Sequence, residues 1–213
     1  MVPNKKPSNK TKSVISDIRK GQIAEAAITV INESGYSNAS LANIAKQAGI
    51  STALISYSFP AKKDLTDFLF EELLKRKITY IIEWVKEAES PTEKLFAYIR
   101  ADLSYSSDHP PEGVSMAELM SNARNKDGTP YYQSESDDSN LLEEIIKIIQ
   151  EDGGFPNIND EALSMIIKGA IKEHVNQQNS NEIDQKTYGD ELISVVSRLT
   201  GFSKKYTVEP LRK

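Results

Sequence analysis

The sequence predicts an all-α protein of about nine helices, in which a small amino-terminal domain precedes a larger helical one. Three observations support this fold class. Apolar residues recur at the helical spacing i, i+3, i+4, i+7 along most of the chain. No run alternates apolar and polar residues as a half-buried strand does. Residues 40–65 contain two short helical patterns joined by a tight turn.

The amino end predicts a flexible basic arm over residues 1–13 and then a first helix. The lysines of the arm suit either a disordered tail or a segment that follows a DNA backbone, and the sequence leaves both open. The helix opens near Arg19 and closes at Gly35. Its apolar positions are Ile23, Ala27, Val30 and Ile31. This helix begins a domain expected to span residues 14–63.

The two short helices carry recognisable start and stop signals. The Ser40 hydroxyl suits the cap of the first helix, and Gly49 suits the left-handed conformation that ends it. Ser51 suits the cap of the second helix, over residues 52–58. A turn of this length sets two helices at a steep angle, so that the second helix can lie in a DNA major groove.

These signals predict a helix-turn-helix DNA-binding site. The outward face of the second helix supplies candidates for base edges and flanking phosphates, whereas Lys62 and Ser40 are candidates for backbone phosphates. The candidate DNA-binding residues are Lys20, Ser40, Ser51, Thr52, Ala53, Ser56, Tyr57 and Lys62. A plain helical hairpin inside an all-α core would give the same helix-glycine-helix pattern.

Residues 19–70 resemble the DNA-binding domain of the TetR family of transcriptional regulators. The resemblance lies in the pair Ala26-Ala27, in Gly35 followed by Tyr36, in the run from Ile44 to Ser51, and in Phe59 followed three residues later by Lys62. Three positions depart from the family pattern. Ala53 stands where glycine is frequent, Ser56 where a phosphate-contacting tyrosine is usual, and Ser58 where histidine or tyrosine is common. Whether Tyr57 replaces that tyrosine is left open.

Helical periodicity continues through the second domain, expected over residues 64–203, up to a tail at 204–213. A long helix covers 65–85, and Ser90-Pro91-Thr92-Glu93 forms a capping box that starts the next. Prolines 110 and 111 end that helix. The remaining helices are expected at 112–125, 141–151, 160–178 and 187–201, with a polar loop over 126–138.

The resemblance implies that the second domain binds a small effector and pairs two subunits. Aromatic and methionine side chains of its middle helices suit an adaptable pocket for an apolar or aromatic effector. The candidate pocket residues are Tyr80, Trp84, Tyr98, Tyr105, Met116, Met120, Asn122 and Met165. In proteins of this family the last two helices pair with those of a second subunit. The candidate homodimer residues are Ile167, Ile171, His174, Leu192, Val195 and Leu199.

The distribution of charge along the chain supports DNA as a partner of the first domain. The net charge of −5 divides unevenly, because residues 1–63 contain nine Lys or Arg and three Asp or Glu, a balance of +6 that leaves −11 for the remainder. Neutralisation of phosphates supplies much of the affinity for DNA. There are no cysteines and no apolar run long enough to span a bilayer, which leads us to expect a cytoplasmic protein with no membrane partner.

The sequence thus predicts a ligand-responsive transcriptional regulator. It is expected to be a repressor that binds a palindromic operator as a dimer and is released by its effector. No catalytic residues, cofactor or metal site are expected, because the two histidines lack metal-spaced partners and the paired acids fall on polar faces. An all-α adaptor that binds only proteins remains the alternative.

Overall fold

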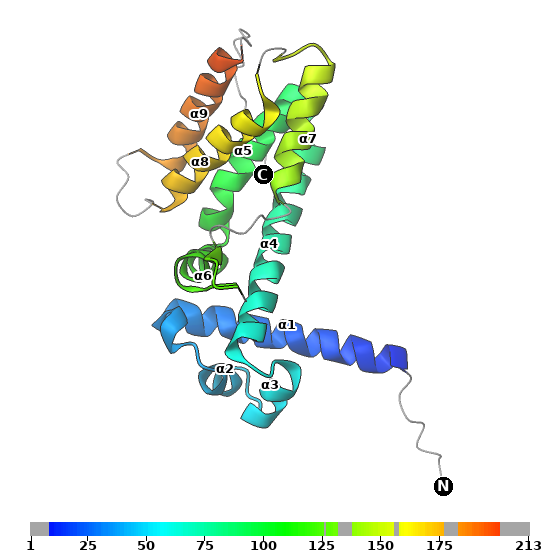
Figure 1. Cartoon of the computed structure of the whole chain (residues 1–213), viewed down its shortest axis with the longest axis vertical. Coiled ribbons are helices and arrows are strands. Elements are labelled where there is room, and N and C mark those ends of the chain that lie inside the picture. The colour runs from blue at the N-terminus through cyan, green and yellow to red at the C-terminus, as the bar shows by residue number, and fades with distance from the viewer. Residues whose placement is uncertain (1–8, 126, 132–137, 156–157, 177–182, 201–213) are drawn as a thin grey trace. The chain divides into compact units, whose positions relative to one another are not determined.

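The all-α class is confirmed by a computed structural model, which describes residues 9–125, 127–131, 138–155, 158–176 and 183–200 (Figure 1). These residues form nine α-helices and one 3-10 helix, and their isolated β-bridge joins Arg124 to Pro130. The elements are α1 (Asn9–Ser34), η1 (Tyr36–Asn38), α2 (Leu41–Gln47), α3 (Thr52–Ser58), α4 (Lys62–Lys86), α5 (Pro91–Asp108), α6 (Pro110–Asn122), α7 (Asp138–Glu151), α8 (Asp160–Asn176) and α9 (Gln185–Leu199).

The chain divides into two compact units, each built from two stretches of sequence. Unit 1 comprises residues 1–76 and 106–135, and unit 2 comprises residues 77–105 and 136–213. The boundary expected at residue 63 therefore differs from the division seen in the structure. Helix α4 contributes its first fifteen residues to unit 1, and α6 belongs to unit 1 as well.

Unit 1 packs α1 against α2, α3, η1 and α6 (Figure 1). Its core combines apolar residues of the first three helices with Leu65, Leu69 and Leu73 of α4. Residues after α6 complete this core, because the Tyr131 side chain is 1% exposed and its ring lies 4.6 Å from that of Phe70. The Tyr131 hydroxyl donates to Asp67, and burial together with this hydrogen bond raises the pKa of the phenol.

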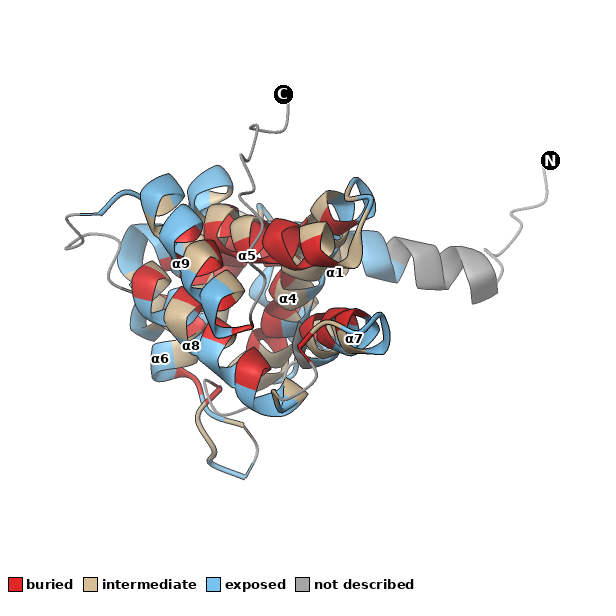
Figure 2. Cartoon of the chain, turned by 90° about the horizontal axis from the view of Figure 1, so that it is seen from above, coloured by how far each residue is buried: buried red, intermediate tan, exposed pale blue. Residues whose placement is uncertain are grey.

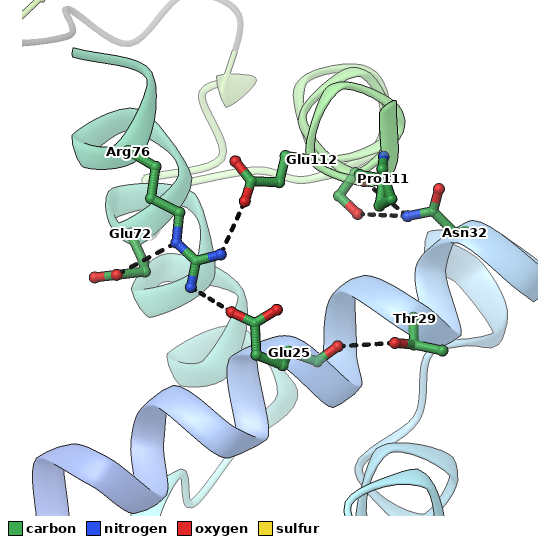
Figure 3. A network of polar contacts seen from close by, with 8 residues as sticks. Glu25, Thr29, Asn32, Glu72, Arg76, Pro111 and Glu112 are labelled. Atoms are coloured by element: carbon green, nitrogen blue, oxygen red, sulfur yellow. Dashed lines mark hydrogen bonds and ion pairs between the residues drawn. The ribbon is translucent and has the colours of Figure 1, made fainter. Parts of the chain in front are cut away.

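A half-buried guanidinium joins three elements of unit 1. Arg76 on α4 contacts Glu25 of α1 at 2.5 Å, Glu112 of α6 at 3.0 Å and Glu72 of its own helix at 3.5 Å (Figure 3). Burial opposes the charge of Arg76, but the hydrogen bonds to Glu25 and Glu112 raise its pKa overall. In the same view, Asn32 of α1 donates to the Pro111 carbonyl of α6. Polar contacts thus join α6 to α1 and α4.

Unit 2 has its own apolar core, to which the end of α4, α5, α7, α8 and α9 contribute. Helix α7 shows the amphipathic pattern clearly, with Leu142, Ile145, Ile146 and Ile149 buried on one face and exposed residues on the other (Figure 2). Helix α5 starts at the expected capping box, since the Glu93 N–H donates to the Ser90 hydroxyl and the Ser90 N–H donates to the Glu93 carboxylate.

Every expected helix is present, and most have shifted ends. Helix α1 begins at Asn9, inside the stretch expected to be a flexible arm, and α6 runs over 110–122 rather than 112–125. Residues 1–8 and the expected tail 204–213 lie outside the described residues. No described helix combines the length and apolar character needed to cross a membrane.

Candidate functional site

The turn between α2 and α3 has the geometry that its sequence predicts. The Ser40 hydroxyl accepts from the Asn43 N–H at 3.1 Å, and the Ser51 hydroxyl accepts from the Leu54 N–H at 3.2 Å. Gly49 has a φ of 66°, in the left-handed region where side chains are disfavoured. Both predicted caps and the glycine turn are therefore confirmed, and they fix where α3 begins.

Helix α3 presents one face to the core of unit 1 and another to solvent. Ile55 and the following Phe59 are buried, at 0% and 3% exposure. The Tyr57 side chain is 85% exposed. The candidate base-contacting residues are all exposed, namely Thr52, Ala53, Ser56 and Tyr57. The structure therefore leaves this surface of small side chains and one aromatic ring accessible to a groove.

Lys62, the candidate phosphate contact, begins α4 and is half-buried. Its ammonium donates to the Tyr36 carbonyl at 2.6 Å and lies 4.2 Å from the centre of the Tyr36 ring. Burial lowers the pKa of Lys62. The Lys20 ammonium of α1 lies 5.7 Å from the Phe68 ring centre. Sequence reasoning missed the role of Tyr36, which η1 brings to Lys62 from 26 residues away.

The candidate effector-pocket residues are divided between the two units. Tyr80, Trp84, Tyr98 and Tyr105 belong to unit 2. The Tyr80 ring lies 5.9 Å from that of Trp84 and 5.6 Å from that of Tyr105. Three others, Met116, Met120 and Asn122, belong to unit 1, where the two methionines pack against its core. Met165 on α8 is 68% exposed.

A buried ion pair accompanies the aromatic residues of unit 2. The Lys77 ammonium lies 2.7 Å from the Asp102 carboxylate, and the Asp102 side chain is 7% exposed. Lys77 precedes Tyr80 by one helical turn, and Asp102 precedes Tyr105 by the same spacing. Sequence reasoning missed this pair. Its signal was an acidic residue on the otherwise apolar stripe of the 91–108 helix.

The candidate dimer residues also fall into two groups. Ile167, Ile171, His174 and Leu192 are between 0% and 8% exposed in the single chain, because they pack inside unit 2. Val195 and Leu199 of α9 are 46% and 56% exposed. On α8 the exposed large apolar side chains are Met165 and Ile166. We refer to Met165, Ile166, Val195 and Leu199 as the α8–α9 outer face. In the described residues, no group of three acidic or histidine side chains is arranged to hold a metal ion.

Comparison with known proteins gives a consistent result. The family model described as bacterial regulatory proteins, tetR family, matches residues 23–67. The fatty acid metabolism regulator protein of Bacillus subtilis is 33% identical over 154 residues, which cover 71% of this chain and 70% of that protein. The HTH-type transcriptional regulator BetI of Vibrio atlanticus is 42% identical over 60 residues, 28% of this chain and 30% of BetI.

Solved structures extend the likeness beyond the amino-terminal helices. The transcriptional regulator FadR from Bacillus subtilis in complex with stearoyl-CoA superposes with a TM-score of 0.66 and 25% identity, covering 83% of this chain and 96% of that one. A putative TetR-family regulator from Rhodococcus sp. has a TM-score of 0.73 at 16% identity, covering 85% and 98%. The second likeness shows the fold alone.

Proposed function

This chain belongs to the tetR family of bacterial regulatory proteins, and from that premise we propose that it is a dimeric repressor released from its operator by an acyl thioester of coenzyme A. It is a ligand-responsive, DNA-binding transcriptional regulator, not an enzyme. The observation that carries the DNA-binding part of the proposal is the capped, exposed helix α3 in a chain whose amino-terminal part is basic.

For DNA recognition, we assign base contacts and phosphate contacts to different residues. Thr52, Ala53, Ser56 and Tyr57 supply hydroxyl, methyl and aromatic groups for base edges and nearby phosphates. Lys62, Ser40 and Lys20 supply contacts to the backbone, while Ser51 holds the start of α3. Arginine and asparagine are absent from α3, so DNA shape contributes to the choice of site.

The DNA proposal is tested with duplexes from the region upstream of the protein's own gene. Fluorescence anisotropy at several salt concentrations gives affinity and the number of phosphates neutralised. We expect one palindromic segment to bind at least about 1,000-fold more tightly than random duplex at equal salt. Equal affinity for all duplexes and for heparin would contradict sequence-specific regulation and would favour an adaptor that binds only proteins.

The effector class is proposed from the relatives and from unit 2. A relative of 25% identity was solved in complex with stearoyl-CoA, and the Bacillus subtilis relative is named as a regulator of fatty acid metabolism. Unit 2 offers the aromatic group of Tyr80, Trp84 and Tyr105 beside the Lys77–Asp102 pair. An acyl chain suits the aromatic rings. The coenzyme A part of the effector is proposed from the relatives, because Asp102 already neutralises the charge of Lys77.

Release of DNA from the protein–DNA complex measures the response to the effector directly. Stearoyl-CoA is added to the preformed protein–DNA complex, with coenzyme A alone and stearate alone as controls. A near-complete switch requires the effector to favour the released conformation by about 5 kcal/mol. We expect release by the thioester at concentrations where neither control acts. Equal release by stearate would mean that the coenzyme A part of the thioester is not recognised. No release by any of the three compounds would overturn the effector assignment while leaving DNA binding in place.

The dimer is proposed through the α8–α9 outer face. Its four apolar side chains are between 46% and 68% exposed, and a second copy of the chain would cover them. Ile166→Glu is expected to shift the protein to monomer in sedimentation velocity at micromolar concentration. Ile148→Glu on α7 is the matched control, because Ile148 is an exposed apolar residue outside that face. A monomeric wild-type protein would contradict the proposal.

A further inference from the structure

Tyr36 lies at a junction of polar contacts inside unit 1. Its N–H donates to the Glu118 carboxylate at 2.9 Å, and its carbonyl accepts from the Lys62 ammonium at 2.6 Å. Its hydroxyl lies 3.4 Å from the hydroxyl of Thr66. One residue of η1 is thus held by α6 on one side and by the start of α4 on the other.

The α6 side of this junction is well defined. The Asn122 side chain donates to Glu118 Oε2 at 3.4 Å, and it also donates to the Glu118 carbonyl at 3.1 Å. Gly35 has a φ of 77°, and a Cβ built there would lie 3.6 Å from the same carboxylate oxygen. The carboxylate therefore lies directly against the backbone at residues 35 and 36. A hydrogen bond from a backbone N–H to a carboxylate is stronger than one between neutral groups.

The α4 side of the junction ends at the candidate phosphate contact. A lysine ammonium has three donors, of which the Tyr36 carbonyl takes one. The position of that carbonyl and of the Tyr36 ring, 4.2 Å from the ammonium, constrains the direction in which the remaining donors point. Lysine side chains on a surface otherwise sample many rotamers, and ordering them on binding costs affinity.

We propose that Glu118 is a positioning residue for DNA binding, which acts through Tyr36 to hold the Lys62 ammonium where it meets a DNA phosphate. The inference rests on the proposed DNA contact of Lys62. It gives α6 control over a contact made by α4, although Glu118 and Tyr36 are 82 residues apart in sequence. Any event that moves α6 away from η1 then weakens the phosphate contact.

A double-mutant cycle tests the inference in the full-length protein. Glu118→Ala, Lys62→Ala and the double variant are compared for operator affinity at several salt concentrations. We expect each single change to weaken binding about 5- to 10-fold and to reduce the salt slope by about 0.9 for each phosphate that is no longer neutralised. In the Lys62→Ala background, Glu118→Ala should cost less than about twofold, because its effect passes through the missing ammonium. Glu118→Gln should bind within about twofold of wild type, since its amide oxygen accepts the same hydrogen bond.

Glu112→Ala provides the matched control. Glu112 is also an acidic residue of α6 that ties the helix to unit 1, but it contacts Arg76 instead of Tyr36. Its effect should add to that of Lys62→Ala. Full additivity between Glu118→Ala and Lys62→Ala, or equal losses in Glu118→Gln and Glu118→Ala, would overturn the inference. If thermal unfolding shows that Glu118→Ala does not fold, Glu118→Met replaces it, with the same outcomes. Absence of salt-dependent binding by the wild type would instead refute the proposed function itself.

Discussion

At the scale of one residue, Tyr57 shows that the side chains of α3 that can recognise a partner differ from those that stabilise the fold. Its side chain is 85% exposed, whereas Ile55 two residues earlier is completely buried. A large aromatic ring that stays in water contributes little to the stability of the fold, but it offers a partner contact area and a hydroxyl group. We therefore expect changes at Tyr57 to alter which duplex is preferred while the stability of the protein stays the same.

Replacing Tyr57 by alanine tests this separation. Tyr57→Ala should reduce the preference for the operator over a variant duplex by about tenfold, since one base contact contributes about 1–3 kcal/mol of discrimination. Tyr57→Phe is the control, because it keeps the ring and removes only the hydroxyl. Affinities measured for a panel of operator variants give the preference, and a thermal melt gives the stability. Uniform weakening on every duplex would instead make Tyr57 a phosphate contact.

Local chemistry made some residues predictable and others not. Ser40, Gly49 and Ser51 were predicted correctly, because a cap or a left-handed turn depends on neighbours within four residues. The partners of Lys62 were not predictable in this way. Its carbonyl partner is 26 residues away, and the group holding that partner is on α6. Contacts between residues so far apart in sequence depend on tertiary packing, which cannot be read from a single sequence.

At the scale of elements, the recognition helix is short and depends on its surroundings. Helix α3 has seven residues, too few to be stable in isolation. It is held by the Ser51 cap at its start and by the burial of Ile55 and Phe59. Loss of the cap should therefore loosen the whole helix and weaken DNA binding as well as folding.

Ser51→Ala is expected to lower the free energy of unfolding by about 1 kcal/mol, because the Leu54 N–H loses its acceptor. Operator affinity should fall with it. Ser51→Asn supplies another good capping side chain and should restore the unfolding free energy. Urea denaturation checks both variants. An unchanged midpoint in Ser51→Ala would show that the cap contributes nothing to the folded state.

The packing of α8 against α9 includes a histidine. The buried His174 ring is stacked on that of Tyr188, with centres 4.1 Å apart. Burial lowers the pKa of His174 below its ordinary 6.5, and the charge of Asp184 opposes part of that shift. Well above pH 6.5 the imidazole is neutral in both the folded and the unfolded state. As pH falls below 6.5 the unfolded chain binds the proton more readily, so the folded state loses stability.

The prediction is a decrease in the free energy of unfolding between pH 7.5 and pH 5.5 that depends on His174. His174→Phe keeps an aromatic ring against Tyr188 and should show a smaller decrease over the same range. Urea unfolding at the two pH values measures the change in the free energy of unfolding. Asp184→Asn is a second variant, which removes the opposing charge. An identical pH dependence in His174→Phe and the wild type would rule out this histidine as the cause.

Helix positions were predictable from the sequence, but the neighbours of each apolar face were not. The stripes of the last two helices were expected to form the dimer contact, yet Ile167 and Leu192 pack within unit 2. A periodic stripe shows that a helix has an apolar face without showing what covers it. The exposed residues Ile166 and Val195 belong to the same predicted stripes as the buried ones, and only tertiary structure distinguishes the two groups.

At the scale of the whole molecule, the DNA-binding unit is discontinuous in sequence. Unit 1 takes residues 106–135 from beyond the first stretch of unit 2. Leu119, Ala123 and Tyr131 of this segment are all at most 1% exposed in the unit 1 core. The helix-turn-helix is therefore supported by residues that its sequence motif does not include.

A fragment of residues 1–76 tests this dependence. It lacks the burial of Leu119 and Tyr131, a deficit on the order of 5 kcal/mol or more, comparable with the total stability of a small domain. We expect no cooperative thermal transition in circular dichroism, whereas the full chain should show one. A sharp transition in the fragment would mean that α1, α2, α3 and the first fifteen residues of α4 are sufficient for a stable fold.

The order of synthesis gives this discontinuity a further consequence. Ser58 is translated 73 residues before Tyr131. At about 5–20 residues per second, a ribosome takes roughly 4–15 s to cover that interval. During this time the nascent polypeptide carries the recognition sequence without the groups that close its core. A translation product that ends before Tyr131 is therefore expected to lack a folded DNA-binding unit, and so not to compete with the finished protein for its operator.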